Sequence, residues 1–482
     1  MRLIRNTFIY FLVTFLQKTV QFFLLPVYTA FLTVRDYGII NLVIPLTNIL
    51  MIFFSLSLPS AGTRLYYRHF GDEEKIRKIW GVIFTFVMVN SVFFFVLITC
   101  LYPWVLRPLM KGVDFYPYVF LGLVASVFYP GYFIYQSDLQ ARQKGGRFGI
   151  NNFAYFLCNA LLIILFITVF RLKATGVLLA LLLTNFGFFV YTLFVYVPGL
   201  KLGLDGPLLK SFLVYSLPLV PHALAGWLMT AIDRFFLNTM VSTSAVGIYG
   251  IGFIIANVIG TVSLALNQAY VPWFFEMAEK GEEGKARIRK FSEIFVVFYC
   301  LLALGLILLS PEVLTVMVTA DFRSGWTVVP MLAFAFVFNG VYYLAVNALF
   351  LKRTRVVPFI ILAGILVSVG SNTLLVRSFG ILGAAVSNFL ALLVMSLLTV
   401  FFSERTEKMS LPWGRIYGFI AAAFVLSLSV YLKGYIPAPA YIGLKAVILV
   451  SVIATAGLYY RKDIRRVVDI MLKRFGGQLG KI

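Results

Sequence analysis

The sequence predicts an all-α, polytopic membrane protein of about 14 transmembrane helices, arranged as two parallel six-helix lobes plus two C-terminal helices. Of its 482 residues, 61% are hydrophobic and only 12% are charged, which is more apolar surface than a soluble core could bury. Long charge-free runs recur along the chain, and a bilayer span needs about 20 such residues. The runs lack the period-two alternation of a membrane β-barrel.

Eleven of the predicted spans contain no Asp, Glu, Lys or Arg over 18 or more residues. Three weaker candidates complete the set: residues 7–32 are interrupted by Lys18, and residues 414–432 and 440–460 are shorter. The charge-free spans are residues 37–63, 79–106, 115–137, 148–170, 174–200, 211–232, 235–275, 294–311, 324–351, 356–376 and 378–403.

Basic residues gather on one side of this predicted topology. With the N-terminus placed in the cytoplasm, 30 of the 41 Lys and Arg residues fall in cytoplasmic segments and 8 in outer loops. Because cytoplasmic loops of membrane proteins carry an excess of Lys and Arg, this distribution predicts that both termini are cytoplasmic. The formal charge of +22 is therefore explained by topology and does not indicate nucleic-acid binding.

The two halves of the chain share a sequence pattern. Residues 71–79 (GDEEKIRKI) recur as residues 281–291 (GEEGKARIRKF), and residues 36–50 align with residues 245–259. The copies surround the second and eighth predicted spans. Since an even number of spans separates them, they have the same orientation in the membrane. This pattern predicts two parallel lobes related by an axis normal to the bilayer, as alternating-access transporters require.

The alignment places Gly38 on Gly247 and Asn48 on Asn257. It also gives the predicted division of the chain. We expect an N-terminal six-helix lobe over residues 1–205, a C-terminal six-helix lobe over residues 206–408, two additional spans over residues 409–460, and a basic amphipathic cytoplasmic tail over residues 461–482.

Charged residues at membrane depth are the first candidates for function, because each costs a few kcal/mol there. Lys18 is predicted to face a central cavity and to pair with an anionic substrate; a structurally paired lysine is the alternative. Asp233 and Arg234 are adjacent in the seventh span and point about 100° apart on a helix, so they should not pair simply with each other. One of them is expected to face the cavity, and a structural salt bridge at the membrane interface is the alternative.

The same seventh span contains two prolines and a histidine. Pro218 and Pro221 free backbone carbonyls and predict a bent helix that moves. His222 could titrate near neutral pH and couple transport to protons, although a hydrogen-bonded structural histidine is the commoner case.

Other polar residues are weaker candidates. The amides of Asn48 and Asn257 could bind sugar hydroxyls, while helix–helix contact is their more common role. Four charged residues at the inner ends of the second and fourth spans could line an inward mouth, and ordinary positive-inside anchoring also explains the arginines. These residues are Arg64, Arg68, Asp138 and Arg142.

The C-terminal tail and the absent motifs complete this picture. Residues 461–475 (RKDIRRVVDIMLKRF) place apolar residues at helical spacing opposite basic ones, which predicts a helix lying on anionic membrane lipids. The sequence lacks GxxxxGK[ST], HExxH and GxSxG, so we predict no catalytic residues, no metal site and no cofactor. Uphill transport would then use H⁺ or Na⁺, or the gradient of the substrate itself.

Three segments resemble the polysaccharide transporter family, which includes the O-antigen and related lipid-linked oligosaccharide flippases of the multidrug/oligosaccharidyl-lipid/polysaccharide superfamily. They are residues 23–43, residues 216–259, which contain IDRFF and VGIYGIG, and residues 267–279. Ala30 stands where this family commonly has arginine. This departure weakens the case for the family's cation at that position and makes Lys18 a stronger candidate. Asp233 and Arg234 match the Asp-Arg pair of the family.

The resemblance implies a V-shaped pair of lobes in the bacterial cytoplasmic (inner) membrane that export an undecaprenyl-diphosphate-linked oligosaccharide, such as an O-antigen, capsule or exopolysaccharide repeat unit. Other glycan-assembly membrane proteins are possible partners. A drug or metabolite exporter of the same superfamily is the alternative, and an acidic cavity without cations would favour it. A membrane glycan polymerase or ligase would need a substantial outer loop, and the outer loops predicted here are short. A scaffold in a glycan-assembly complex is a further alternative.

Overall fold

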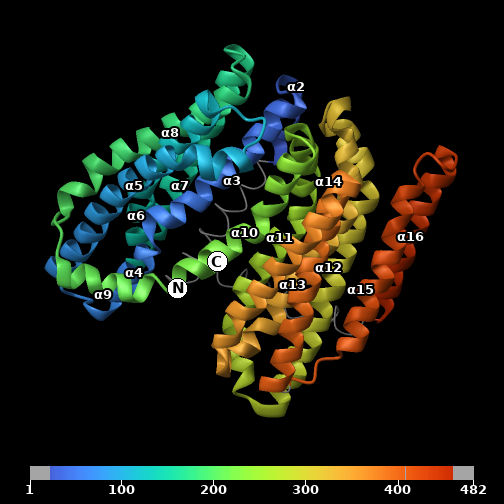
Figure 1. The fold of residues 1–482 in the computed structure, drawn as a ribbon. Coiled ribbons are helices and arrows are strands. Elements are labelled where there is room, and N and C mark those ends of the chain that lie inside the picture. Colours follow the sequence, from blue (N-terminus) through green and yellow to red (C-terminus); the bar gives the residue numbers. More distant parts are fainter. Residues whose placement is uncertain (1–21, 408, 460–482) are drawn as a thin grey trace, which may run out of the picture.

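The computed structural model describes residues 22–407 and 409–459, and this part of the chain is almost entirely helical. Figure 1 shows two bundles, one formed by the helices up to α9 and one by the helices from α10 onward, with α15 and α16 at the outer edge of the second. The α-helices are α2 (Leu25–Phe31), α3 (Val34–Ser55), α4 (Leu58–Arg68), α5 (Glu73–Leu109), α6 (Phe120–Ala141), α7 (Gly145–Ile164), α8 (Lys173–Val195), α9 (Gly206–Ser216), α10 (Leu219–Met240), α11 (Thr243–Ala278), α12 (Gly281–Met317), α13 (Val329–Lys352), α14 (Val357–Thr406), α15 (Trp413–Ser427) and α16 (Ala438–Tyr459).

The predicted number of spans agrees with these helices. Eleven of the described helices are long and apolar enough to cross a membrane, and α9 with α10 forms a twelfth span that bends by 46°. Helix α14 supplies one more, because its 50 residues would be about 75 Å long and the hydrocarbon core is only about 30 Å thick. The first predicted span lies mostly outside the described residues. The expectation of an all-α membrane protein with about 14 spans is confirmed.

Helix α14 is a hairpin of two spans that turns at Gly380. This glycine has φ 55° and ψ −128°, a conformation that side chains with a β-carbon rarely adopt. The two arms then run side by side, so that Gly364 of the first arm packs against Ala391 and Met395 of the second. The two predicted spans 356–376 and 378–403 correspond to these arms.

The second predicted span, residues 37–63, is broken within the membrane. Leu56 and Ser57 both have left-handed backbone conformations, with φ of 44° and 56°, which separate α3 from α4. A helix end in a membrane needs partners for its free carbonyls. The amide of Asn90 provides them, since it donates to the carbonyl oxygens of Phe53 and Phe54 at 2.9 and 2.8 Å.

The seventh span is bent where its prolines predicted. Helix α9 ends at Ser216, and Pro218 is the N-cap of α10. The short helix α9 packs on α4 and α5 through Phe212, which is fully buried in the smaller of two hydrophobic cores. Helix α10 belongs to the larger core. The seventh span therefore joins both cores, and the division predicted between residues 205 and 206 stays a prediction.

The two lobes meet where α3 crosses α11, and the contact is reciprocal. A β-carbon added to Gly38 would overlap the carbonyl oxygen of Thr243, and one added to Gly247 would overlap the carbonyl oxygen of Val34. Val34 and Thr243 are themselves equivalent in the predicted repeat. The helices also begin alike, with N-caps at equivalent positions that each accept a backbone N–H at 3.1 Å, Thr33 from Asp36 and Ser242 from Ala245. The predicted axis that relates the two lobes would thus pass through this crossing.

The two additional spans pack on the outside of the second lobe. Lys445 of α16 is almost fully buried and pairs with Glu312 of α12 at 2.8 Å. Its ammonium group also lies 4.2 Å from the ring centre of Tyr441. A paired charge at this depth fixes where α16 docks on α12.

Candidate functional site

Asp233 lies in the interior of the second lobe and is fully buried. Its carboxylate accepts three hydrogen bonds from two other helices. Tyr249 of α11 donates its hydroxyl at 2.8 Å, and the amides of Asn372 and Asn388 on the two arms of α14 donate at 2.9 and 2.8 Å. The carboxylate therefore joins α10, α11 and both arms of α14 at one point.

The same cluster has the donor set of a cation site. The side-chain oxygens of Asn372 and Asn388 are buried and accept no hydrogen bond from the described residues. Rotating each amide by 180° would turn its oxygen toward the carboxylate of Asp233. Carboxylate and amide oxygens are ligands for hard cations such as Na⁺, and these three side chains carry oxygens of both kinds.

Arg234 occupies a different face of α10 and is only 7% exposed. Its guanidinium donates to the carbonyl oxygen of Thr230 and lies 4.3 Å from the ring centre of Phe253 on α11. Its Nε is buried without a partner, and no carboxylate of the described residues forms an ion pair with it. Asp233 and Arg234 form no salt bridge with each other, as the helix geometry predicts.

The face of α10 that carries Arg234 is exposed in the turns that precede it. Thr230, one turn earlier, is exposed, and Trp227, two turns earlier, is 41% exposed. Arg234 is also near enough to Tyr37 of α3 for its charge to act on that phenol. The guanidinium thus lies at the junction of α3, α10 and α11, where a ligand between the lobes could reach it.

The other predicted residues are dispersed around this junction. Asn48 and Asn257 are half-buried at equivalent positions of α3 and α11, and within the described residues their amides have no hydrogen-bond partner. His222 is exposed at the start of α10. Lys18 lies outside the described residues, as does the predicted tail helix. The roles of these residues stay predictions.

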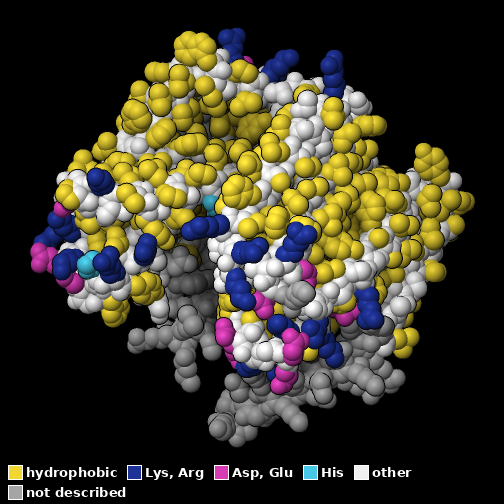
Figure 2. Space-filling view, turned by 60° about the horizontal axis from the view of Figure 1, so that its bottom comes forward, with side chains coloured by type: hydrophobic (Ala, Val, Ile, Leu, Met, Phe, Trp, Pro, Cys, Tyr) yellow, Lys and Arg dark blue, Asp and Glu magenta, His cyan; other side chains and the backbone are white. Residues whose placement is uncertain are grey.

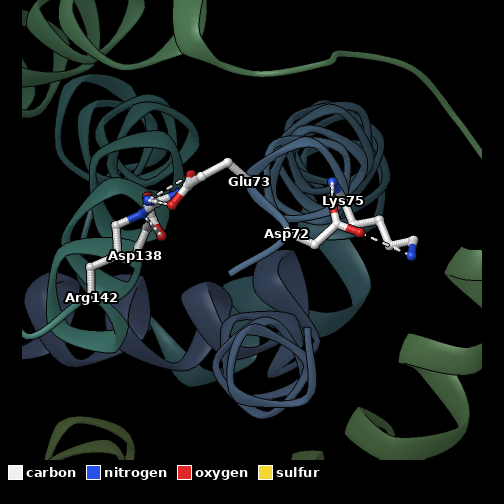
Figure 3. Close-up of polar contacts among 5 residues, drawn as sticks. All are labelled: Asp72, Glu73, Lys75, Asp138 and Arg142. Atoms are coloured by element: carbon white, nitrogen blue, oxygen red, sulfur yellow. Dashed lines mark hydrogen bonds and ion pairs between the residues drawn. The ribbon is translucent and has the colours of Figure 1, made fainter. Parts of the chain in front are cut away.

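The predicted inward mouth contains an ion-pair network. Arg142 donates to Asp138 at 2.8 Å and to Glu73 at 3.0 Å, and Figure 3 shows its guanidinium lying between these two carboxylates. The network joins the end of α6 to the start of α5. Arg64 is exposed and lies 4.6 Å from the ring centre of Tyr215 on α9, and Arg68 is exposed.

Each lobe carries ion pairs between its helices at this end, which we call the basic end. In the first lobe Lys201 pairs with Glu74, and Lys78 pairs with Asp205 at 2.6 Å. In the second lobe, Glu407 pairs with both Lys285 and Lys352. Figure 2 turns this end forward and shows basic and acidic side chains along both lobes, with hydrophobic side chains on the flanks. Segments that were predicted to share one side of the membrane therefore lie together.

The pairing at the basic end depends on pH. The ion pair with Lys78, with help from the backbone N–H of Leu208, holds the pKa of Asp205 below its usual range. The stabilisation from this pair is therefore present above the ordinary pKa of an aspartate and is lost as the pH falls through the lowered value.

Sequence reasoning missed three residues of the buried cluster. Tyr249, Asn372 and Asn388 each lie in a charge-free span, where a polar side chain signals helix–helix contact without revealing its partner. Their proximity to Asp233 follows only from the hairpin of α14 and its packing on α10 and α11.

Comparison with known proteins identifies the family. The family of polysaccharide biosynthesis proteins matches residues 3–278. Lsg locus putative protein 1 of Haemophilus influenzae is 22% identical over 382 residues, which cover 78% of this chain and 87% of that protein. An uncharacterized membrane protein of Methanocaldococcus jannaschii is 24% identical over 427 residues, which cover 83% of this chain and 98% of that protein.

Solved structures share the fold. The lipid II flippase MurJ in an inward closed conformation superposes with a TM-score of 0.73 at 14% identity, over 94% of this chain and 99% of that one. An inward-facing multidrug resistance MATE family transporter of the MOP superfamily gives a TM-score of 0.62 at 14% identity, over 83% of this chain and 95% of that one. With more than half of its length matched by the family model, the chain belongs to the polysaccharide biosynthesis protein family, and it shares its fold with these transporters.

Proposed function

We propose that this protein is a flippase that moves a lipid-linked oligosaccharide across the cytoplasmic membrane of a bacterium by alternating access. The observation that carries this proposal is the environment of Arg234. A buried guanidinium that forms no salt bridge with a carboxylate of the described residues is costly at membrane depth, and an anionic ligand would offset that cost. A lipid diphosphate supplies that charge, since guanidinium groups bind phosphate oxygens with paired hydrogen bonds.

The surroundings of Arg234 suit the remainder of such a substrate. The amides of Asn48 and Asn257 lie on the two helices that join the lobes, have no hydrogen-bond partner among the described residues, and could bind sugar hydroxyls. The reciprocal crossing of α3 and α11 closes the end opposite to the basic end. With the basic end in the cytoplasm, as the positive-inside rule requires, this arrangement would load the substrate from the inner leaflet. A drug exporter would instead favour an acidic cavity.

The cluster around Asp233 is the proposed site of the coupling ion, H⁺ or Na⁺. A cation bound there would exchange the hydrogen bonds from α11 and α14 for bonds to oxygen atoms. Because α10 carries both Asp233 and Arg234, such a change would alter the surroundings of the guanidinium one residue away.

Deleting the gene tests the flippase proposal. Surface glycan should be lost, and lipid-linked repeat units should accumulate on the inner leaflet, where they stay inaccessible to externally added glycosidase. Complementation with the wild-type gene is the control. Normal surface glycan in a deletion strain that lacks a redundant homologue would contradict the proposal, and loss of glycan without inner-leaflet accumulation would favour a polymerase or ligase.

Replacing Asp233 with asparagine tests the coupling site. The purified wild-type protein should show a melting temperature that rises with Na⁺ at constant ionic strength or changes with pH. Asp233→Asn should remove that response, because it removes the charge of the carboxylate on which the cluster converges. The exposed Asp321→Asn is the matched control. A sodium response assigns Na⁺ and a pH response assigns H⁺, whereas a wild-type protein insensitive to both would contradict the assignment.

A further inference from the structure

A buried asparagine joins the two lobes at the end opposite to the basic end. Asn238 lies two residues before the end of α10 and is 4% exposed. Its amide donates to the carbonyl oxygens of Leu109 and Lys111, both at 3.0 Å, where α5 of the first lobe ends. The amide thus uses both of its hydrogens, and it satisfies carbonyls that have no partner within α5. The second lobe thereby holds the end of a helix of the first.

A further hydrogen bond fixes the orientation of this amide. The hydroxyl of Thr243, at the start of α11, donates to the Oδ1 atom of Asn238 at 2.8 Å, which leaves Nδ2 to face α5. The carbonyl group of Thr243 in turn packs against Gly38 at the crossing of α3 and α11. The bridge made by Asn238 is therefore continuous with the contact that closes this end of the molecule.

Asn238 lies on the same face of α10 as Arg234. Four residues separate them, so their side chains are about 40° apart around the helix and about 6 Å apart along its axis. Exposure falls along this face toward the end opposite to the basic end, from Trp227 at 41% through Arg234 at 7% to Asn238 at 4%. A ligand that reaches Arg234 along this face would therefore meet Asn238 next, one turn further on.

We propose that Asn238 is a latch, a contact that must break before the lobes can separate at this end, and that a diphosphate headgroup bound at Arg234 releases it. The proposal rests on the proposed flippase function. Phosphate oxygens accept charge-assisted hydrogen bonds, which are about twice as strong as bonds to a neutral carbonyl. The phosphates of a headgroup held by Arg234 would compete with the carbonyls of α5 for the amide. Substrate binding is thus linked to separation of the lobes.

A second hydrogen bond between the lobes lacks this connection to Arg234. Thr319, the N-cap of the 3-10 helix η4 (Ala320–Val328), donates to the carbonyl oxygen of Thr29 in α2 at 3.1 Å. This bond also joins the second lobe to the first, but it does not involve α10. Its loss should loosen the same end of the molecule without removing the response to a headgroup, which makes Thr319 a matched comparison for Asn238.

Distances between spin labels test the latch in the purified full-length protein in nanodiscs without polyprenyl lipid. The labels replace the exposed Arg107 and Arg323, one in each lobe at this end. Asn238→Leu keeps the approximate size of the side chain and removes both donors, so the ratio of separated to closed lobes should rise about ten-fold. Thr243→Val, which leaves the amide free to rotate, should give a smaller rise in the same direction.

Asn185→Leu is the matched control. Asn185 is also 4% exposed, and its amide also donates to a backbone carbonyl, that of Ala125 at 2.8 Å, but both residues belong to the first lobe. This variant should lower the melting temperature and leave the distance between the labels unchanged. An unchanged distance in a folded Asn238→Leu protein would overturn the proposal, because an asparagine with only a structural role would behave as Asn185 does.

Adding the headgroup provides the second measurement. Undecaprenyl diphosphate in the nanodisc should lengthen the distance in the wild-type protein, whereas undecaprenol, which has the same chain and no phosphate, should not. Arg234→Ala should abolish this response, Asn238→Leu should show no further lengthening, and Thr319→Val should retain the response. The absence of a response in the wild-type protein, an equal response to undecaprenol, or a response that survives Arg234→Ala would overturn release of the latch by the headgroup.

The outcome is separable from that of the flippase proposal. Separation of the lobes by Asn238→Leu, in a protein whose deletion leaves surface glycan normal, would retain the latch and reject the flippase function. Loss of glycan on deletion, together with an unchanged distance in Asn238→Leu, would do the reverse.

Discussion

Replacing Arg234 with alanine is expected to lower glycan export about 100-fold while leaving the protein folded. Removing one partner of a buried charge pair costs about 3 kcal/mol, and each 1.4 kcal/mol changes an equilibrium ten-fold. Among the described residues, the guanidinium forms no salt bridge, and its direct contacts are the carbonyl oxygen of Thr230 and the ring of Phe253. Its removal should therefore leave the melting temperature unchanged or raise it.

Export is measured as the rate at which surface glycan reappears in a deletion strain that expresses each variant at the same level. Arg234→Lys should retain part of the activity, because it keeps the charge and loses the paired hydrogen bonds. The exposed Arg377→Ala, at the turn of α14, is the control and should export normally. Full export by Arg234→Ala would remove the anion-binding role of this residue.

Replacing Gly247 with leucine is expected to force the two lobes apart at the end opposite to the basic end. The crossing of α3 and α11 has no space for even a β-carbon at this position. Overpacking of this kind costs about 1–3 kcal/mol in protein interiors, which is enough to shift a conformational equilibrium several-fold. Transport should fall steeply, because the closed arrangement of this end would no longer be reached.

Spin labels at Arg107 and Arg323, exposed residues of the first and second lobes at that end, measure the change. In a background without the three native cysteines, Gly247→Leu should lengthen the distance between the labels. Gly370→Leu is the control, because a β-carbon added there meets no atom within 4 Å. An unchanged distance together with normal export would show that the crossing is not the contact that closes this end.

The spans and their arrangement could be predicted because their signals are local. A charge-free run of 20 residues identifies a span wherever it lies, and Arg377 between two such runs marked the hairpin of α14 as two spans. The prolines of the seventh span likewise marked its bend. The break at Leu56 and Ser57 had only the weaker signal of Pro59 in the first turn of α4, and it also depends on Asn90 of another helix to satisfy the free carbonyls.

The site was only partly predictable for the same reason. Asp233 and Arg234 stood out because a charge in an apolar span is costly, and helix geometry alone placed them on different faces. The partners of Asp233 lie 16, 139 and 155 residues later in the chain, and only packing brings them together. A sequence reveals which residues need partners more readily than it reveals the partners.

The crossing of α3 and α11 also shows that equivalent positions of the two repeats can carry different residues that fit each other. A β-carbon on Gly250 would lie only 2.8 Å from the side chain of Asn41, and these residues occupy equivalent positions of the two repeats. In a symmetric homodimer of one ancestral unit, both positions would carry the same residue: two asparagines would collide and two glycines would leave a void. In a single fused chain the two positions can differ, so that a larger residue on one half packs against a glycine on the other.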